Sequence, residues 1–203
     1  LKSFFAIDLG VFSSTAAIEA AGITPHQIDH TFFGNALQTS ADAIYLARHI
    51  ALRAGIPDEK PALTINRLCG SGFEAVVQGA KEIILGEADV ALTGGTESMS
   101  QAPHVVRGAR WGGLRLGPAG GQFEDLLWGA LTDTNCGLSM AQTAEELAER
   151  YGITRPEVDA VAFHSQQRAK TAWGEGHFDA EVTPIVFKTR KGETTYAADE
   201  QIR

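Results

Sequence analysis

Apolar and polar residues alternate along the N-terminal half of the chain in blocks that predict helices and strands in turn. Apolar residues recur at helical spacing in three segments, which predict helices over residues 9–21, 41–53 and 73–85. Between them lie short runs rich in aromatic and β-branched residues, which predict strands over residues 30–34, 61–68 and 89–93. Strand, helix and strand in this order form a βαβ unit, so the pattern predicts an α/β fold with parallel strands.

Glycine and proline mark the ends of these predicted helices. Gly22 follows the first helix, Gly55 and Pro57 follow the second, and Gly86 follows the third. Gly86 stands where a helix commonly ends in a left-handed residue, a conformation that glycine adopts without steric cost. We therefore expect Gly86 to be a C-terminal cap.

The pattern changes after Ser100. Residues 107–122 are rich in glycine and show no clear period, which predicts a long, structured loop. Near the C-terminal end of the sequence, residues 182–197 predict two strands around a turn at residues 190–192.

Two amphipathic helices are predicted between that loop and those strands. They cover residues 140–151 and 155–173. Thr154 is in position to cap the second helix, and Glu157 three residues later completes a capping box.

Composition narrows the class of protein. Hydrophobic residues make up 44% and charged residues 21% of the 203 residues, which is typical of a soluble globular protein. The formal net charge of −8 argues against nucleic acid as a partner, because such binding depends on Lys and Arg neutralising phosphates. No apolar run reaches the roughly 18 residues that a membrane helix needs, so we expect no membrane.

The sequence contains two cysteines, Cys69 and Cys136, and no C-x-x-C pair. This number and spacing argue against a disulfide scaffold or a zinc ribbon and favour a reducing compartment. Cys69 is the more informative of the two, because it lies in the run Cys-Gly-Ser-Gly between a predicted strand and a predicted helix.

A thiol at the start of a helix faces unpaired backbone N–H groups and the positive end of the helix dipole. Both stabilise a thiolate, and the same N–H groups can hold an oxyanion when the thiolate attacks a carbonyl. Cys69 is therefore a candidate nucleophile for covalent acyl transfer. The alternative from spacing alone is a buried, small apolar residue. Ser71 is a rival nucleophile, but we interpret it as a hydrogen-bonding residue at the helix start, because the G-x-S-x-G pattern is not met.

Four segments resemble motifs of the thiolase family, in the family's order and at its spacings. Residues 66–72 (NRLCGSG) resemble its active-cysteine segment, and residues 94–104 (GGTESMSQAPH) resemble its G-G-x-E-S-M-S-x-A-P motif. Residues 140–145 (MAQTAE) and 34–38 (GNALQ) are similar to two further thiolase segments. Residues 43–66 look especially like the 3-ketoacyl-CoA thiolases of fatty-acid β-oxidation.

The resemblance implies a fold and a domain division. We expect a thiolase-like N-terminal α/β core over residues 1–100, with a mixed sheet covered by helices on both faces and lacking the family's first strand. Residues 101–203 are expected to form a helical loop domain that binds CoA and supports oligomerisation. The C-terminal thiolase domain is expected to be absent.

The resemblance also implies a reaction. Cys69 matches the nucleophile that attacks a 3-ketoacyl-CoA, keeps the acyl group as a thioester while acetyl-CoA leaves, and passes it to CoA. In reverse, two acetyl-CoA molecules condense. CoA and acyl-CoA are then substrates, and no permanently bound cofactor or metal is expected.

Three residues match contacts that the family makes with CoA. Leu127 and Met140 match apolar residues that pack on the pantetheine arm, and Arg203 matches an arginine near the nucleotide. The alternatives are that Leu127 and Met140 are core residues and that Arg203 is a solvated charge. Ser139 stands where some relatives have His. The glycine-rich residues 107–122 match a loop that joins two dimers into a tetramer in many thiolases, and the alternative is a flexible surface loop.

The sequence departs from the family by lacking its N-E-A-F, G-H-P and C-x-G motifs, which supply the histidine and the second cysteine. Without that general base we expect this chain alone to be inactive. The alternative to an enzyme is a CoA-binding or oligomerisation half without turnover, and a ketoacyl synthase is less favoured by the motifs. Expected partners are acyl-CoA and further copies in a homodimer or homotetramer, in bacterial cytoplasm or mitochondrial matrix.

Overall fold

The computed structural model describes residues 1–113, 123–190 and 192–202. The chain separates into two compact units, Leu1–Leu131 and Thr132–Arg203. The elements of the first unit that build its sheet and cover it are α1 (Ala6–Ala20), β1 (His30–Gly34), α2 (Leu46–Arg53), β2 (Ala62–Ile65), α3 (Ser71–Leu85) and β3 (Ala91–Gly95). Short 3₁₀ turns occupy Pro25–Gln27, Ala43–Tyr45 and Met99–Gln101.

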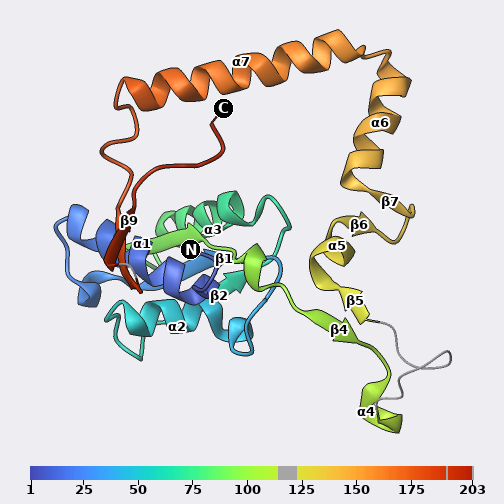
Figure 1. The fold of residues 1–203 in the computed structure, drawn as a ribbon. Coiled ribbons are helices and arrows are strands. Elements are labelled where there is room, and N and C mark those ends of the chain that lie inside the picture. Colours follow the sequence, from blue (N-terminus) through green and yellow to red (C-terminus); the bar gives the residue numbers. More distant parts are fainter. Residues whose placement is uncertain (114–122, 191, 203) are drawn as a thin grey trace. The chain divides into compact units, whose positions relative to one another are not determined.

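The three strands form one sheet in the order β2-β1-β3, with β1 in the centre (Figure 1). Both pairings are parallel: Thr31 lies opposite Ala62 on one side and opposite Leu92 on the other. The α/β fold with parallel strands is confirmed. The expected mixed sheet needs a correction for the described residues, because all three strands of this sheet run in the same direction. Each strand is joined to the next through a helix, and such a crossover returns the chain parallel.

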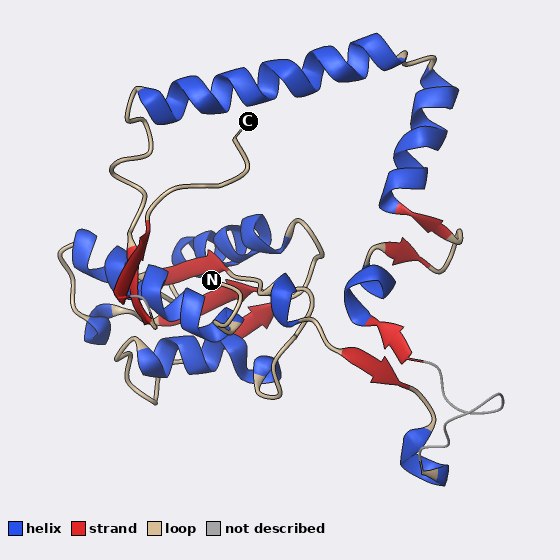
Figure 2. Cartoon of the chain, in the orientation of Figure 1, coloured by secondary structure: helices blue, strands red, loops and turns tan. Residues whose placement is uncertain are grey.

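Helices cover both faces of the sheet, as expected (Figures 1 and 2). On one face, Phe33 of β1 packs in a buried cluster with residues of α1 and α2, namely Ala6, Ile7, Leu46, Ala47 and Ile50. On the other face, α3 lies so close to the strands that a Cβ atom on Gly79 would come 2.6 Å from Thr93 Cγ2 and 3.7 Å from Phe32. Successive residues of β1 therefore anchor opposite layers, as the alternation of side chains along a strand requires.

The predicted boundaries hold best where a local signal fixes them. Strand β1 has the predicted bounds, and α3 ends at Leu85 before Gly86, whose φ of +73° is the left-handed cap. The predicted helix over 41–53 is divided, because a 3₁₀ turn at Ala43–Tyr45 precedes α2. The predicted strand over 61–68 is shorter, since the backbone leaves the sheet after Ile65 to form the turn that carries Cys69.

The remainder of the first unit contains small elements. They are the antiparallel pair β4 (His104–Val106) and β5 (Phe123–Asp125), with α4 (Ala109–Gly112) between them and α5 (Leu126–Ala130) after them. Part of the predicted loop over 107–122 is thus helical, and its residues 114–122 lie outside the described residues.

The second unit holds two helices where the sequence predicted them, α6 (Met140–Tyr151) and α7 (Arg155–Gly174). Helix α6 is amphipathic as predicted, whereas the apolar residues of α7 are distributed around the helix and do not form one face, so the prediction is wrong for α7. The predicted capping box is confirmed: the Thr154 N–H donates to Glu157 Oε2 at 2.8 Å. Two antiparallel pairs complete the unit, β6 (Thr132–Asp133) with β7 (Leu138–Ser139) and β8 (Ile185–Thr189) with β9 (Gly192–Tyr196). The second pair is the predicted pair of strands.

The outer side of α3 is apolar and is not covered by other described residues. Phe73 is 79% exposed and Ile84 is 82% exposed, and Val76, Val77 and Leu85 are also exposed. None of the helices in the described part of the chain combines the length and apolar character that a bilayer crossing demands.

Asp29 ties the entrance of β1 to two other segments. Its carboxylate accepts hydrogen bonds from Lys60 Nζ at 3.0 Å and from the Asp89 and Val90 N–H groups at 2.9 and 3.1 Å. The Lys60 ammonium and these two amides lower the pKa of the Asp29 carboxyl from 3.8 to about 2. The ionised form therefore stabilises the folded state at neutral pH.

We expect Asp29→Asn to lower the midpoint of thermal unfolding near neutral pH. A carboxyl with a depressed pKa stabilises the fold fully above its unfolded value and loses that effect as pH falls through its folded value. The difference between the parent and the variant should therefore shrink between pH 4 and about pH 2. Circular dichroism over this range measures it, with Asp58→Asn as the control for an exposed carboxylate whose side chain has no hydrogen bond among the described residues. A difference that persists unchanged at pH 2 would contradict the assignment.

Candidate active site

The carboxyl ends of β1, β2 and β3 meet at one edge of the parallel sheet, which is where open α/β sheets place their ligand sites. Each strand delivers polar residues there. Asn35 follows β1, Asn66 follows β2, and Thr96 and Glu97 follow β3. The turn that carries Cys69 begins at the same edge.

Cys69 lies in the turn between β2 and α3, two residues before the first residue of the helix, and it is exposed. The alternative that it is a buried apolar residue is therefore wrong. Its thiol makes no hydrogen bond to any described residue. The thiol is thus accessible to a substrate at the start of a helix of 15 residues.

The first N–H groups of α3 are only partly used. Gly70 N donates to Arg67 O and Ser71 N donates to Leu68 O, each at 3.1 Å. The next two amides, of Gly72 and Phe73, have no hydrogen bond within the described residues and belong to exposed residues. They are available to an oxygen that develops negative charge beside Cys69.

Ser71 closes this turn from the inside. Its hydroxyl accepts from the Arg67 N–H at 2.9 Å and donates to Leu68 O at 2.6 Å, and the residue is only 5% exposed. Because the hydroxyl is engaged on both sides and buried, it is the helix-start hydrogen-bonding residue that the sequence suggested, and not an accessible nucleophile.

Gly34 lets β1 approach this turn. A Cβ atom at Gly34 would lie 2.6 Å from the Ser71 carbonyl carbon and 2.8 Å from Ser71 O. These distances are shorter than atoms tolerate, and backbone atoms cannot move aside as a flexible side chain can. A residue without a side chain is therefore required where the central strand meets the start of α3.

Glu97 organises the loop that follows β1. Its carboxylate accepts from Asn35 Nδ2 at 2.7 Å and from the Ala36 N–H at 2.8 Å, with longer bonds of 3.3 Å from the Leu37 N–H. Asn35, buried to 1% exposure, also donates to Thr96 O at 3.0 Å. The ends of β1 and β3 are joined in this way.

Asn66 connects that loop to the Cys69 turn. Its Nδ2 donates to Ala36 O at 3.1 Å, and its Oδ1 accepts from the Leu68 N–H at 3.0 Å. Asn35, Asn66 and Glu97 lie within motifs that resemble those of thiolases, but the motifs alone indicated no role for these three residues. The available signal was their place immediately after predicted strands, where side chains of neighbouring parallel strands converge.

The family model for the thiolase N-terminal domain matches residues 1–203. The chain belongs to the thiolase family. Its resemblance in sequence motifs is thereby confirmed over the whole chain.

Two relatives illustrate how close the match is. This thiolase chain is 53% identical to the human mitochondrial 3-ketoacyl-CoA thiolase over 203 residues, which cover 100% of this chain and 51% of that protein. It is 41% identical to beta-ketothiolase BktB of Cupriavidus necator, again covering 100% of this chain and 51% of the relative. The chain therefore spans about half the length of the curated relatives it matches.

Solved structures give the same result for the fold. The crystal structure of the human mitochondrial 3-ketoacyl-CoA thiolase matches with a TM-score of 0.94 at 53% identity, covering 100% of this chain and 51% of that one. The structure of the human enzyme in complex with CoA matches with a TM-score of 0.92 at 51% identity, covering 100% of this chain and 50% of that one. The thiolase N-terminal fold is thus shown.

The expected CoA-contacting residues are distributed over both units. Leu127 is half-buried in α5, where its N–H donates to Asp125 Oδ1 at 2.9 Å. Met140 is the first residue of α6 and is 51% exposed. Ser139 before it caps the helix, its Oγ accepting from the Gln142 N–H. Arg203 lies outside the described residues, so its role stays a prediction.

Two further residues with potentially reactive side chains, His104 and Cys136, lie outside residues 66–71, the turn that carries Cys69. His104, on β4, has Nε2 3.8 Å from Asp125 Oδ2 and is exposed. Cys136 is exposed in the second unit, with its Sγ 3.8 Å from Asp133 O. Among the described residues no group of three or more His, Cys, Asp or Glu side chains is placed to hold a metal ion.

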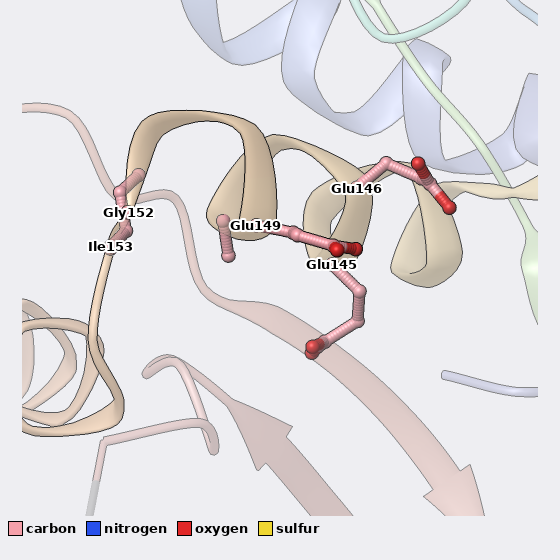
Figure 3. A pocket seen from close by; sticks show the side chains of 6 residues that line it. Glu145, Glu146, Glu149, Gly152 and Ile153 are labelled. Atoms are coloured by element: carbon pink, nitrogen blue, oxygen red, sulfur yellow. The ribbon is translucent and has the colours of Figure 1, made fainter.

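A shallow hollow lies along α6 and its C-terminal end (Figure 3). It is lined by Glu145, Glu146, Ala148, Glu149, Gly152 and Ile153. Three carboxylates on one helix disfavour the phosphates of a CoA molecule, because like charges repel. This hollow is therefore not the site at which CoA is expected.

We expect Gly34→Ala to destabilise the protein by about 1–3 kcal/mol, the usual effect of forcing an atom into a packed site. The physical reason is the clash of the new Cβ with the Ser71 backbone. Urea unfolding measures the loss. The matched control is Gly129→Ala in α5, where a Cβ atom meets nothing within 4 Å. Equal stabilities of the two variants would contradict the close approach.

Proposed function

We propose that the protein acts as an acyl-CoA C-acyltransferase, a thiolase, through an acyl-cysteine at Cys69. It cleaves a 3-ketoacyl-CoA with CoA, or condenses two acetyl-CoA molecules in the reverse direction. The observation that carries the proposal is the exposed Cys69 thiol in the turn before α3, whose Gly72 and Phe73 amides make no hydrogen bond to a described residue. Membership of the thiolase family supports it.

The thiolate of Cys69 attacks the keto carbon, and the carbonyl oxygen becomes negatively charged. Hydrogen bonds from backbone amides stabilise this oxyanion because they are fixed before the charge develops. The bond between the keto carbon and the adjacent α-carbon then breaks, the α-carbon takes up a proton, and acetyl-CoA leaves. The thiol of a second CoA attacks the acyl-cysteine, which gives the shortened acyl-CoA and restores Cys69.

Residues 101–203 supply the CoA-binding part in this proposal, as a helical loop domain that includes α6 and α7. Leu127 and Met140 are proposed to pack on the pantetheine arm and Arg203 to pair with a phosphate of the nucleotide, since a guanidinium suits phosphate geometry. The CoA-bound structure of the human relative supports acyl-CoA as the substrate class. CoA is then a substrate and not a resident cofactor.

The protein is further proposed to work as a homodimer or homotetramer in the mitochondrial matrix or the bacterial cytoplasm. The relatives named mitochondrial and bacterial thiolases support these two compartments. Strand β2 is an edge of the three-stranded sheet and its Leu63 is 48% exposed, which supports pairing through the strand before Cys69.

Complete turnover is not expected of this chain alone, because its sequence lacks the motifs that supply the family's histidine and second cysteine. The first half-reaction needs only the Cys69 thiolate and an oxyanion site. Incubation with acetoacetyl-CoA should therefore add one acetyl group to the chain at Cys69, and intact-mass spectrometry detects it. Cys69→Ala should abolish the adduct, whereas Cys136→Ala, the matched control at the other exposed cysteine, should retain it. An adduct that survives in Cys69→Ala, or no adduct in a folded chain, would contradict acyl transfer by this residue in this chain.

Self-association should be visible by light scattering, because no described residue covers the apolar side of α3 or the edge of β2. We expect a mass at least twice that of one chain. Replacing Leu63 by Lys should lower that mass if β2 contributes, since a charge on an edge strand disfavours pairing. A monodisperse monomer would contradict the proposed assembly.

A further inference from the structure

Two residues other than glycine have a left-handed backbone in the part of the chain that the structure describes. They are Gln38, with φ of +47°, and Leu68, with φ of +48°. Both lie in loops at the carboxyl edge of the sheet, after β1 and after β2. Residues with side chains avoid this conformation because Cβ comes too close to the backbone, and it persists only where the surroundings enforce it.

An asparagine carboxamide holds each of the two residues. The Gln38 N–H donates to Asn35 Oδ1 at 3.2 Å, and the Leu68 N–H donates to Asn66 Oδ1 at 3.0 Å. The Leu68 side chain is 66% exposed, so packing of its own atoms does not impose the conformation. The conformation is instead held by hydrogen bonds to the Leu68 backbone. The Leu68 N–H donates to Asn66 Oδ1, and the Leu68 carbonyl accepts from the Ser71 hydroxyl.

The Asn66 side chain is itself held in place by Ala36, whose backbone is bonded to Glu97. Its Nδ2 donates to Ala36 O, and the N–H of Ala36 donates to Glu97 Oε2 at 2.8 Å. A continuous path of hydrogen bonds therefore runs from Glu97 through Ala36 and Asn66 to Leu68. The end of this path is the residue bonded directly to Cys69.

The φ angle of Leu68 decides where Cys69 and the start of α3 stand relative to β2. Helix α3 is packed against the sheet, where a Cβ atom on Gly79 would come 2.6 Å from Thr93 Cγ2, so it cannot rotate freely with the turn. If Leu68 relaxed to negative φ, the backbone of Cys69 and Gly70 would have to readjust to keep α3 in place. That readjustment would move the Cys69 thiol relative to the Gly72 and Phe73 amides. We propose that Asn66 is a positioning residue that holds Leu68 in the left-handed conformation and thereby aims Cys69. The proposal rests on the proposed function for the acylation that Cys69 performs.

The test compares Asn66→Ala, Leu68→Gly and the double variant in the same chain. Acetyl transfer from acetoacetyl-CoA to Cys69 is followed by mass spectrometry, and alkylation by iodoacetamide is followed on peptides, with Cys136 as the internal reference. Asn66→Ala should slow both reactions of Cys69 about tenfold, the scale of the conformational cost of left-handed Leu. The rate at Cys136 should not change.

Leu68→Gly should restore the Asn66→Ala variant to within about threefold of the parent, because glycine adopts positive φ without a steric cost. A residue with only a general structural role would show no such rescue. If Asn66→Ala alone does not fold, recovery of its cooperative thermal unfolding by Leu68→Gly supports the proposal in the same way.

The proposal is overturned if Asn66→Ala reacts at the parent rate, or if Leu68→Gly leaves its deficit unchanged. The two readouts also separate this inference from the proposed function. If the parent chain forms no acetyl adduct, acyl transfer by this chain fails, yet the ratio of Cys69 to Cys136 alkylation across the variants still decides whether Asn66 positions the thiol.

Discussion

The parallel pairing of β1 with β2 on one side and β3 on the other is the constraint on which the rest of the structure depends. It makes β1 a central strand, with Phe33 buried against α1 and α2 and Phe32 facing α3. It also brings three carboxyl ends to one edge. The residues that follow these ends, far apart in sequence, are thereby forced to share the space in which the Cys69 turn forms.

At that edge, hydrogen bonds from polar side chains take the place of the backbone hydrogen bonds that join the strands of the sheet. Backbone groups beyond the last strand pair lose their partners, and buried ones must find others. Glu97 serves the Ala36 and Leu37 amides, and Asn66 serves both Ala36 and Leu68. Hydrogen bonds act over short distances and in fixed directions. They can therefore hold backbone conformations that are unfavourable for an isolated chain, such as the left-handed conformation of Leu68.

The same arrangement explains how the side chain of an exposed cysteine can be held in a defined position. Its own side chain makes no hydrogen bond to a described residue, so its position follows from the backbone on either side. Before it stands Leu68, held at both its N–H and its carbonyl, and after it stands Ser71, buried and bonded to the Arg67 N–H. The thiol remains free for a substrate while the turn that carries it is restrained, which is the preorganisation that covalent catalysis requires.

The sequence by itself determined the elements whose limits are local. Strand β1, helix α6, the capping box at Thr154 and the left-handed Gly86 follow from periodicity and from capping residues, and the motifs identified the thiolase family and Cys69. Only the tertiary structure decided that β1 is the central strand, in the order β2-β1-β3, and that β2 ends at Ile65. It also decided that Glu97 reaches Ala36, some sixty residues away in sequence. Periodicity reports which face of an element is buried, whereas hydrogen bonds between loops depend on strand order and register, which no local pattern contains.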